Sequence, residues 1–128
     1  MNIHCDCIGV DAGLIAVFDY DYMIKESRGE SQPTQNFEII DVEPGIYTVH
    51  VIIPESWDGR IERLFKLNVS SGKLVVSDPC YWFNEGWMSY LNKTDYCSDY
   101  YSSDHIHFIS TGGDGGFEVT LIIEKENK

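Results

Sequence analysis

An internal repeat constrains the fold of this chain more than any other feature of its sequence. Residues 10–22 are VDAGLIAVFDYDY and residues 69–81 are VSSGKLVVSDPCY, and the two segments align without a gap. Each begins with turn residues, continues as a short apolar strand and ends at an aspartate. The aligned pairs are Val10 with Val69, Gly13 with Gly72, Ile15 with Leu74, Val17 with Val76, Asp19 with Asp78, and Tyr22 with Tyr81.

A second pair of segments repeats as well, because residues 47–55 (YTVHVIIPE) resemble residues 117–125 (FEVTLIIEK). Each half therefore contains a turn, a short apolar strand, an insertion and a long strand. One such half cannot bury its own apolar face, so we expect the halves to pack about an approximate two-fold axis. We also predict that strands 14–18 and 74–77 are near neighbours, and that Gly13 and Gly72 both adopt a positive φ.

Turn residues separate the remaining apolar segments into short strands. Asp58-Gly59 predicts a tight turn that joins strands 46–53 and 61–69 in a hairpin. The Gly-rich loop 112–116 predicts a second hairpin, between strands 105–110 and 117–124. The fold class expected for the whole chain, residues 1–128, is one all-β domain, mainly antiparallel, as a sandwich or barrel. The other predicted strands are 3–8, 14–18, 37–42 and 73–77.

Two insertions interrupt the repeat. Residues 25–36 are polar and have the composition of a loop, whereas residues 84–104 are irregular, with a short helix suggested near Trp87. The second insertion is acidic and rich in aromatic residues, which is typical of protein contact surfaces. The residues expected to contact a partner are Trp87, Tyr90, Asp95, Tyr96, Asp99, Tyr100, Tyr101 and Asp104.

The net charge of −12 bears on the kind of partner. Such a surface disfavours direct binding to nucleic acid and to anionic membranes, and it favours a protein partner with a basic surface. The alternative is that the charge only maintains solubility. The start, MNIHCDC, does not have the pattern of a signal peptide, so we expect a cytoplasmic protein with reduced cysteines.

Several segments together resemble a poorly characterised family of small bacterial and phage proteins. The matching residues are 10–13 (VDAG) with Asp19, 78–81 (DPCY), 112–117 (GGDGGF) and 57–64 (WDGRIERL). In that family the DPCY segment precedes the VDSG segment, and tyrosine is usual where this chain has Phe117. The resemblance implies a phage or mobile-element setting, in which small acidic proteins often bind and block another protein.

Asp19 and Asp78 occupy equivalent positions, so a two-fold axis would bring their carboxylates together. With Asp114 they could hold a hard cation such as calcium, or act as an acid–base pair. The alternative is that each aspartate accepts backbone hydrogen bonds within its own turn.

The cysteines lack the CxxC spacing of zinc sites, but one pair of cysteines and one pair of histidines could still form a site. We predict that Cys5 and Cys7 share one face of a strand, and that His105 and His107 share one face of another. If these strands paired, the four side chains could bind zinc; otherwise the cysteines are small buried residues. The glycine-rich loop, residues 112–116, opens a strand, which favours a connection over a phosphate site.

The sequence shows no Ser-His-Asp set and no other nucleophile motif, although Cys80 could use His105 as a base. We therefore expect a non-catalytic protein without a cofactor, which blocks a host-defence or nucleic-acid enzyme by protein contact. The alternative is a module that binds a small molecule or a divalent metal, or a hydrolase, using the repeated aspartates.

Overall fold

A computed structural model describes residues 1–11, 13–21, 37–78 and 105–126, which form eight β-strands. Short runs of β-branched and aliphatic residues, most of them ended by Asp or Ser, account for these strands. The strands are β1 (Asn2–Val10), β2 (Leu14–Asp19), β3 (Phe37–Asp41), β4 (Gly45–Ser56), β5 (Gly59–Val69), β6 (Lys73–Ser77), β7 (Ile106–Ser110) and β8 (Gly115–Lys125).

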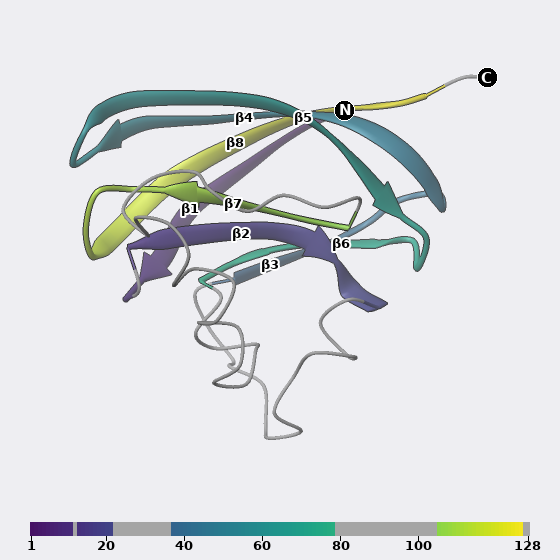
Figure 1. The fold of residues 1–128 in the computed structure, drawn as a ribbon, viewed down its shortest axis with the longest axis horizontal. Coiled ribbons are helices and arrows are strands. Elements are labelled where there is room, and N and C mark those ends of the chain that lie inside the picture. Colours follow the sequence, from purple (N-terminus) through teal and green to yellow (C-terminus); the bar gives the residue numbers. More distant parts are fainter. Residues whose placement is uncertain (12, 22–36, 79–104, 127–128) are drawn as a thin grey trace, which may run out of the picture.

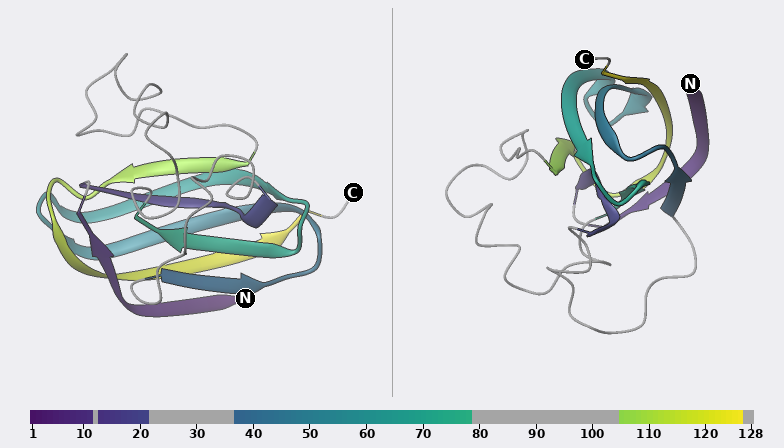
Figure 2. Two further views of the ribbon diagram at one scale, coloured as in Figure 1. Left: turned by 90° about the horizontal axis from the view of Figure 1, so that it is seen from below. Right: turned by 90° about the vertical axis from the view of Figure 1, so that its right-hand side faces the viewer.

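The strands form two antiparallel sheets that pack face to face as a β-sandwich. Sheet A has the order β1-β8-β4-β5, and sheet B has the order β3-β6-β2-β7. Figure 1 shows β4, β5 and β8 along the top, with β2, β3 and β6 beneath them. In the left view of Figure 2 the strands of both sheets follow the same long direction. The predicted all-β, mainly antiparallel fold is therefore confirmed, and of the two predicted forms, sandwich and barrel, the chain adopts the sandwich.

One apolar cluster fills the space between the sheets. Alternate side chains of β4 and β8 point into it, as the period of two in a strand requires. Its central members from sheet A include Val49, Val51 and Leu121, and sheet B contributes Ile15, Val17 and Val76. All six side chains are fully buried.

The strand registers reveal a two-fold relation between the first half of the chain, β1–β4, and the second half, β5–β8. Val17 lies opposite Val76 in the β2–β6 ladder, and the sequence repeat aligns these same two residues. In sheet A, Val51 lies opposite Leu121, which are also aligned by the repeat. The order of each sheet accordingly reads the same from either edge when β1 exchanges with β5, β2 with β6, β3 with β7 and β4 with β8.

The predicted neighbouring positions of strands 14–18 and 74–77 are thus confirmed, because β2 and β6 pair directly. Gly13 and Gly72 have φ values of 74° and 81°, which confirms the predicted turn conformation at both positions. The predicted hairpin of strands 46–53 and 61–69 is confirmed as well, as β4 and β5.

Two predictions are wrong, one about which strands pair and one about which side chains share a strand face. Strands β7 and β8 form no hairpin, because β7 belongs to sheet B and β8 to sheet A, and the loop 111–114 crosses between the sheets. In β1, a bulge between Cys5 and Ile8 shifts the alternation. Cys5 is consequently buried and Cys7 exposed, so the two thiols do not share a strand face.

Candidate functional site

Trp57 is a large exposed aromatic residue at the tip of the β4–β5 hairpin. Its side chain is 70% exposed, which is unusual for a residue that normally contributes buried area. The turn is fixed locally, because the Ser56 hydroxyl accepts a hydrogen bond from Asp58 N at 3.0 Å and donates one to Gly59 O at 2.7 Å. The indole is therefore presented on a structured turn.

The glycine-rich loop between β7 and β8 holds the indole in place. Trp57 Nε1 donates a hydrogen bond to Asp114 O at 2.7 Å, and Trp57 N donates to Thr111 O at 3.1 Å. A Cβ atom on Gly113 would lie 2.8 Å from the indole Cδ1, so only glycine allows this approach. The loop thus supports Trp57, which explains its glycines without a phosphate ligand.

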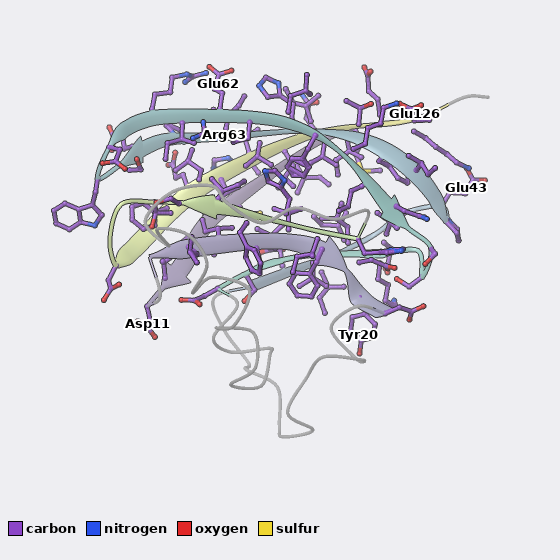
Figure 3. The ribbon with its side chains drawn as sticks, viewed as in Figure 1. Asp11, Tyr20, Glu43, Glu62, Arg63 and Glu126 are labelled. Atoms are coloured by element: carbon purple, nitrogen blue, oxygen red, sulfur yellow. The ribbon has the colours of Figure 1, made fainter. Side chains whose placement is uncertain are left out.

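Thr111 joins this hairpin tip to the turn between β1 and β2. It is fully buried, and its backbone N–H donates to Gly13 O at 3.0 Å. Figure 1 shows the β4–β5 turn, the β7–β8 connection and the β1–β2 turn at the same left-hand end of the sandwich, and Figure 3 places Asp11 there. We call this region the Trp57 end.

An open depression of about 340 Å³ lies beside the indole at the Trp57 end. It combines aromatic surface with carboxylates, and among the described residues no basic one contributes to its lining. Arg60 follows closely in the chain, but its guanidinium is paired with Glu62 at 2.7 Å. The lining residues are Glu55, Ser56, Trp57, Asp114, Gly115, Gly116 and Phe117, and Asp11 and Asp58 are exposed nearby in the same set of turns.

This arrangement of an indole among carboxylates has the features of a site that binds a cationic group. An exposed tryptophan face attracts ammonium and guanidinium groups, and flanking carboxylates add charge-assisted hydrogen bonds. Sequence reasoning identified Asp58-Gly59 only as a turn and did not select Trp57. The sequence signal that could have found Trp57 is an aromatic residue directly before a tight turn, because a side chain at a hairpin tip has no core in which to be buried.

Asp19 and Asp78 do not converge. They lie toward opposite ends of the antiparallel β2–β6 ladder, since Asp19 pairs with Leu74 and Ser77 pairs with Ala16. Four residues of strand separate them along the ladder, about 13 Å. The predicted convergence at the two-fold axis is therefore wrong, and Asp114 lies in the exposed β7–β8 loop. Within the part of the chain that the structure describes, no group of three or more potential metal ligands was found.

Each of these two aspartates instead binds the turn of the opposite half. Asp19, 1% exposed, accepts hydrogen bonds from the Ser70 hydroxyl at 3.0 Å and from Ser71 N at 3.2 Å. Asp78, fully buried, accepts one from Asp11 N. The alternative of turn capping is supported, with the correction that each carboxylate caps its partner turn and not its own.

Asp19, Ser71 and His105 gather at the other end of the sandwich, a combination that sequence reasoning did not predict. His105 Nδ1 lies 3.6 Å from Asp19 Oδ2 and donates a hydrogen bond to Asn68 O at 3.0 Å. The Ser71 hydroxyl donates to Asp19 Oδ1 and not to the imidazole. A serine nucleophile needs a basic nitrogen to take its proton, so this geometry is that of a structural cap.

The four residues predicted to bind zinc are not brought together. Cys5 and Cys7 lie on β1, which pairs with β8, whereas His107 lies on β7, which pairs with β2. The His107 ring stacks on Phe65 of β5 at a centroid distance of 4.1 Å. Burial raises the pKa of the Cys5 thiol to about 12, with a further contribution from Glu38 and Asp6, which disfavours the thiolate that a metal needs.

Ion pairs occupy several exposed charges, both close to the β4–β5 hairpin tip and at the end opposite Asp11. Hydrogen bonds from Arg60 and His50 hold the pKa of Glu62 below its usual value. Lys125 lowers the pKa of Glu43 in the same way, at an N–O distance of 2.8 Å. Figure 3 shows Glu43 and Glu126 at the end opposite Asp11. Because these pairs are exposed, each contributes little to stability.

The predicted partner-contact residues in 84–104, and the short helix suggested there, lie outside the described residues. Comparison with known proteins gave no match to a family model, to a curated protein or to a solved structure. In the described segments, no helix is long and apolar enough to cross a membrane.

Proposed function

We propose that this protein is a non-catalytic binding protein, and that the Trp57 end contacts a basic surface of a protein partner. The observation that carries the proposal is the exposed, hydrogen-bonded Trp57 among the carboxylates of Glu55, Asp58 and Asp114. Tryptophan and a complementary charge are the commonest components of strong contact sites.

The fixed position of Trp57 supports this function energetically. A side chain that is already held in its bound geometry loses little conformational entropy when a partner arrives. Hydrogen bonds from the indole and from the Trp57 backbone to two loop carbonyls, together with the close approach of Gly113, hold the indole before binding. A lysine or arginine side chain of the partner would lie against the indole face, with its charge directed to the carboxylates.

The charge of the whole chain supports a basic partner as well. A net charge of −12 steers cationic surfaces toward the protein and repels nucleic acid. The resemblance to small phage proteins favours a host enzyme of defence or nucleic-acid metabolism as the partner, because such enzymes carry basic surfaces for phosphate backbones. Binding at that surface would block the enzyme, and the cytoplasm would be its setting.

The test compares two substitutions at equally exposed side chains. Trp57 and Leu64 are both 70% exposed, but Leu64 lies on β5 away from the depression. We expect wild-type protein and Leu64→Ala to capture the same partner from a host lysate at low salt. Trp57→Ala should weaken the affinity for that purified partner by about 30-fold, the effect of losing roughly 2 kcal/mol at a central contact.

The affinity should also fall as ionic strength rises, because exposed charges are screened beyond about 10 Å at 0.1 M salt. Gly113→Ala provides a second variant, since it displaces the indole without removing it. Gly113→Ala should weaken binding to the partner as Trp57→Ala does, although the surface around Leu64 is unchanged. If Trp57→Ala and Leu64→Ala bind the partner equally, or if no partner is captured at low salt, the proposed function is wrong.

A further inference from the structure

The depression at the Trp57 end is lined on one side by backbone that carries no side chain. Gly115 and Gly116, the first two residues of β8, both contribute to its lining. Glycine in a strand often marks a place where another group approaches the backbone closely. Because neither residue has a side chain that would fill the hollow, a flat group can enter it beside the indole.

The loop between β7 and β8 holds one part of the Trp57 indole and leaves another part open. Nε1 donates its hydrogen bond to Asp114 O, and a Cβ atom on Gly113 would lie within 3.3 Å of Cδ1, Nε1 and Cε2. All three atoms belong to the five-membered ring. Since the side chain is 70% exposed, the six-membered ring is open to solvent. The face of an aromatic ring is its electronegative part, so it attracts cations.

Two carboxylates line the same depression, from different elements. Glu55 lies near the end of β4, and Asp114 lies in the β7–β8 loop. Neither carboxylate forms an ion pair with another described residue. Both are therefore able to accept hydrogen bonds from a cation that lies on the indole.

Three kinds of cationic side chain differ in how well they suit these features. A trimethylated ammonium has no N–H to donate to a carboxylate, and it is bound in cages of several aromatic faces. Among the described lining residues, Trp57 is the exposed aromatic one, since Phe117 is only 7% exposed. A lysine ammonium is compact and strongly hydrated, so an open depression gives it little advantage over water.

The guanidinium of arginine suits the site better than either of these. It is planar and more weakly hydrated than an ammonium, and it stacks on aromatic faces. When it is stacked, its N–H donors lie in the plane of the group and point sideways, where carboxylates can accept them in pairs. A flat hollow, one open ring face and carboxylates beside it provide for each of these contacts.

We propose that the depression at the Trp57 end is an arginine-binding site. The guanidinium of the partner stacks on the six-membered ring of Trp57 and donates hydrogen bonds to the carboxylates of Glu55 and Asp114. This inference rests on the proposed function, which requires a basic partner surface, and it names the side chain of that surface that is recognised.

Four short glycine peptides test the assignment, with arginine, lysine, trimethyl-lysine or citrulline at the centre. The full-length, isotope-labelled protein is titrated with each, and the indole N–H signal of Trp57 is followed by nuclear magnetic resonance. Its absence in Trp57→Phe identifies this signal. We expect the arginine peptide to shift it at the lowest concentration, with lysine and trimethyl-lysine about 10-fold weaker. Citrulline is planar but uncharged, and it should give no saturable shift.

The outcomes that overturn the arginine site are distinct from failure of the proposed function. Binding of the lysine, trimethyl-lysine or citrulline peptide as tightly as the arginine peptide would overturn the site, as would no shift with any of the four. A partner whose capture depends on Trp57, together with either of these results, would keep the proposed function and reject arginine as the recognised side chain.

Charge removal then tests the two carboxylates. Glu55→Gln and Asp114→Asn keep the size of each side chain, and Asp114→Asn also keeps the backbone carbonyl that holds the indole. Each should weaken binding of the arginine peptide about 5-fold, because a hydrogen bond to an ionised acceptor is the stronger kind. Glu124→Gln is the matched control, since Glu124 is an exposed carboxylate of β8 outside the lining. It should leave the affinity unchanged, and equal affinities in all three variants would overturn the proposed site.

Discussion

Buried Asp19 is the clearest case of one side chain that ties the two halves together. Its carboxylate lies in the first half and accepts hydrogen bonds from Ser70 and Ser71 in the second. Hydrogen bonds to an ionised group contribute about 1.5–3 kcal/mol each, and an unpaired buried partner adds a penalty. Asp19→Asn should therefore lower the free energy of unfolding by about 2–3 kcal/mol in urea denaturation.

Asp6→Asn is the matched control, because the Asp6 side chain is 97% exposed and lies in an exposed pair with His4. It should change stability by less than about 0.5 kcal/mol. Equal effects of the two substitutions would show that Asp19 does not hold the turn.

Cys5 should make the stability of the fold sensitive to alkaline pH. Burial raises the pKa of its thiol from 9.0 to about 12, so the unfolded chain loses this proton at lower pH than the folded protein does. The free energy of unfolding should accordingly fall as pH rises from about 9 to about 12. Cys5→Ala should flatten this part of the stability profile, measured by urea denaturation at several pH values.

The identity of these residues could be predicted from the sequence, but their partners could not. Asp19 and Asp78 were recognisable as equivalent positions at strand ends. Their hydrogen bonds to the opposite turn depend on the antiparallel β2–β6 pairing, which places each aspartate beside the start of the other strand. A sequence repeat shows which positions are equivalent, but it does not show which residues lie opposite each other in a strand ladder.

At the scale of the element, the two equivalent turns differ in how tightly they are packed. Both Gly13 and Gly72 have positive φ, which costs other residues about 1–2 kcal/mol. Among the described residues, a Cβ atom on Gly13 would approach only Gly113, at 3.9 Å, whereas one on Gly72 would lie 3.1 Å from Val42 O. The sequence repeat alone predicts equal effects of substitution at the two positions, whereas their packing predicts a larger effect at Gly72.

Gly13→Ala should destabilise the protein by about 1–2 kcal/mol, from backbone strain alone. Gly72→Ala should cost more, because the backbone carbonyl of Val42 has little freedom to move. Substitution by valine should increase both losses to a few kcal/mol. Thermal and urea unfolding of the four variants measure this order, and a larger loss at Gly13 than at Gly72 would contradict it.

Hairpins were predictable where the turn itself determines the pairing. Asp58-Gly59 forces β4 and β5 into direct contact, and the register follows from the turn. The loop 111–114 has hairpin composition too, yet it changes sheets, because its glycines serve the approach to Trp57 and Asp58. Local composition cannot distinguish these two uses of glycine.

At the scale of the whole molecule, the two halves interdigitate completely among the described strands. Sheet A alternates strands of the first and second halves as β1-β8-β4-β5, and sheet B does so as β3-β6-β2-β7. Every described ladder therefore joins one half to the other. The repeat predicted a two-fold relation, but packing of two separate halves would satisfy the same repeat, so the alternation could not be inferred.

Interdigitation predicts how the chain behaves when it is cut. A break between Trp57 and Asp58, at the exposed tip of the β4–β5 hairpin, separates the two halves without removing a ladder. Fragment 1–57 retains β1–β4, and fragment 58–128 retains β5–β8. Among the described strands, no two within the same fragment pair with each other. Each fragment alone should be unfolded, because it can form no sheet and bury no core.

Mixing the fragments should restore the sandwich. We expect a one-to-one complex with the far-ultraviolet circular dichroism of the intact chain, and a melting temperature that rises with fragment concentration, because assembly is now bimolecular. A matched cut elsewhere, between Ser71 and Gly72, would divide the second half and remove the Asp19-bound turn, so it should reassemble less well. A folded, monomeric fragment 1–57 would contradict the alternating strand order, since that order leaves it nothing with which to pair.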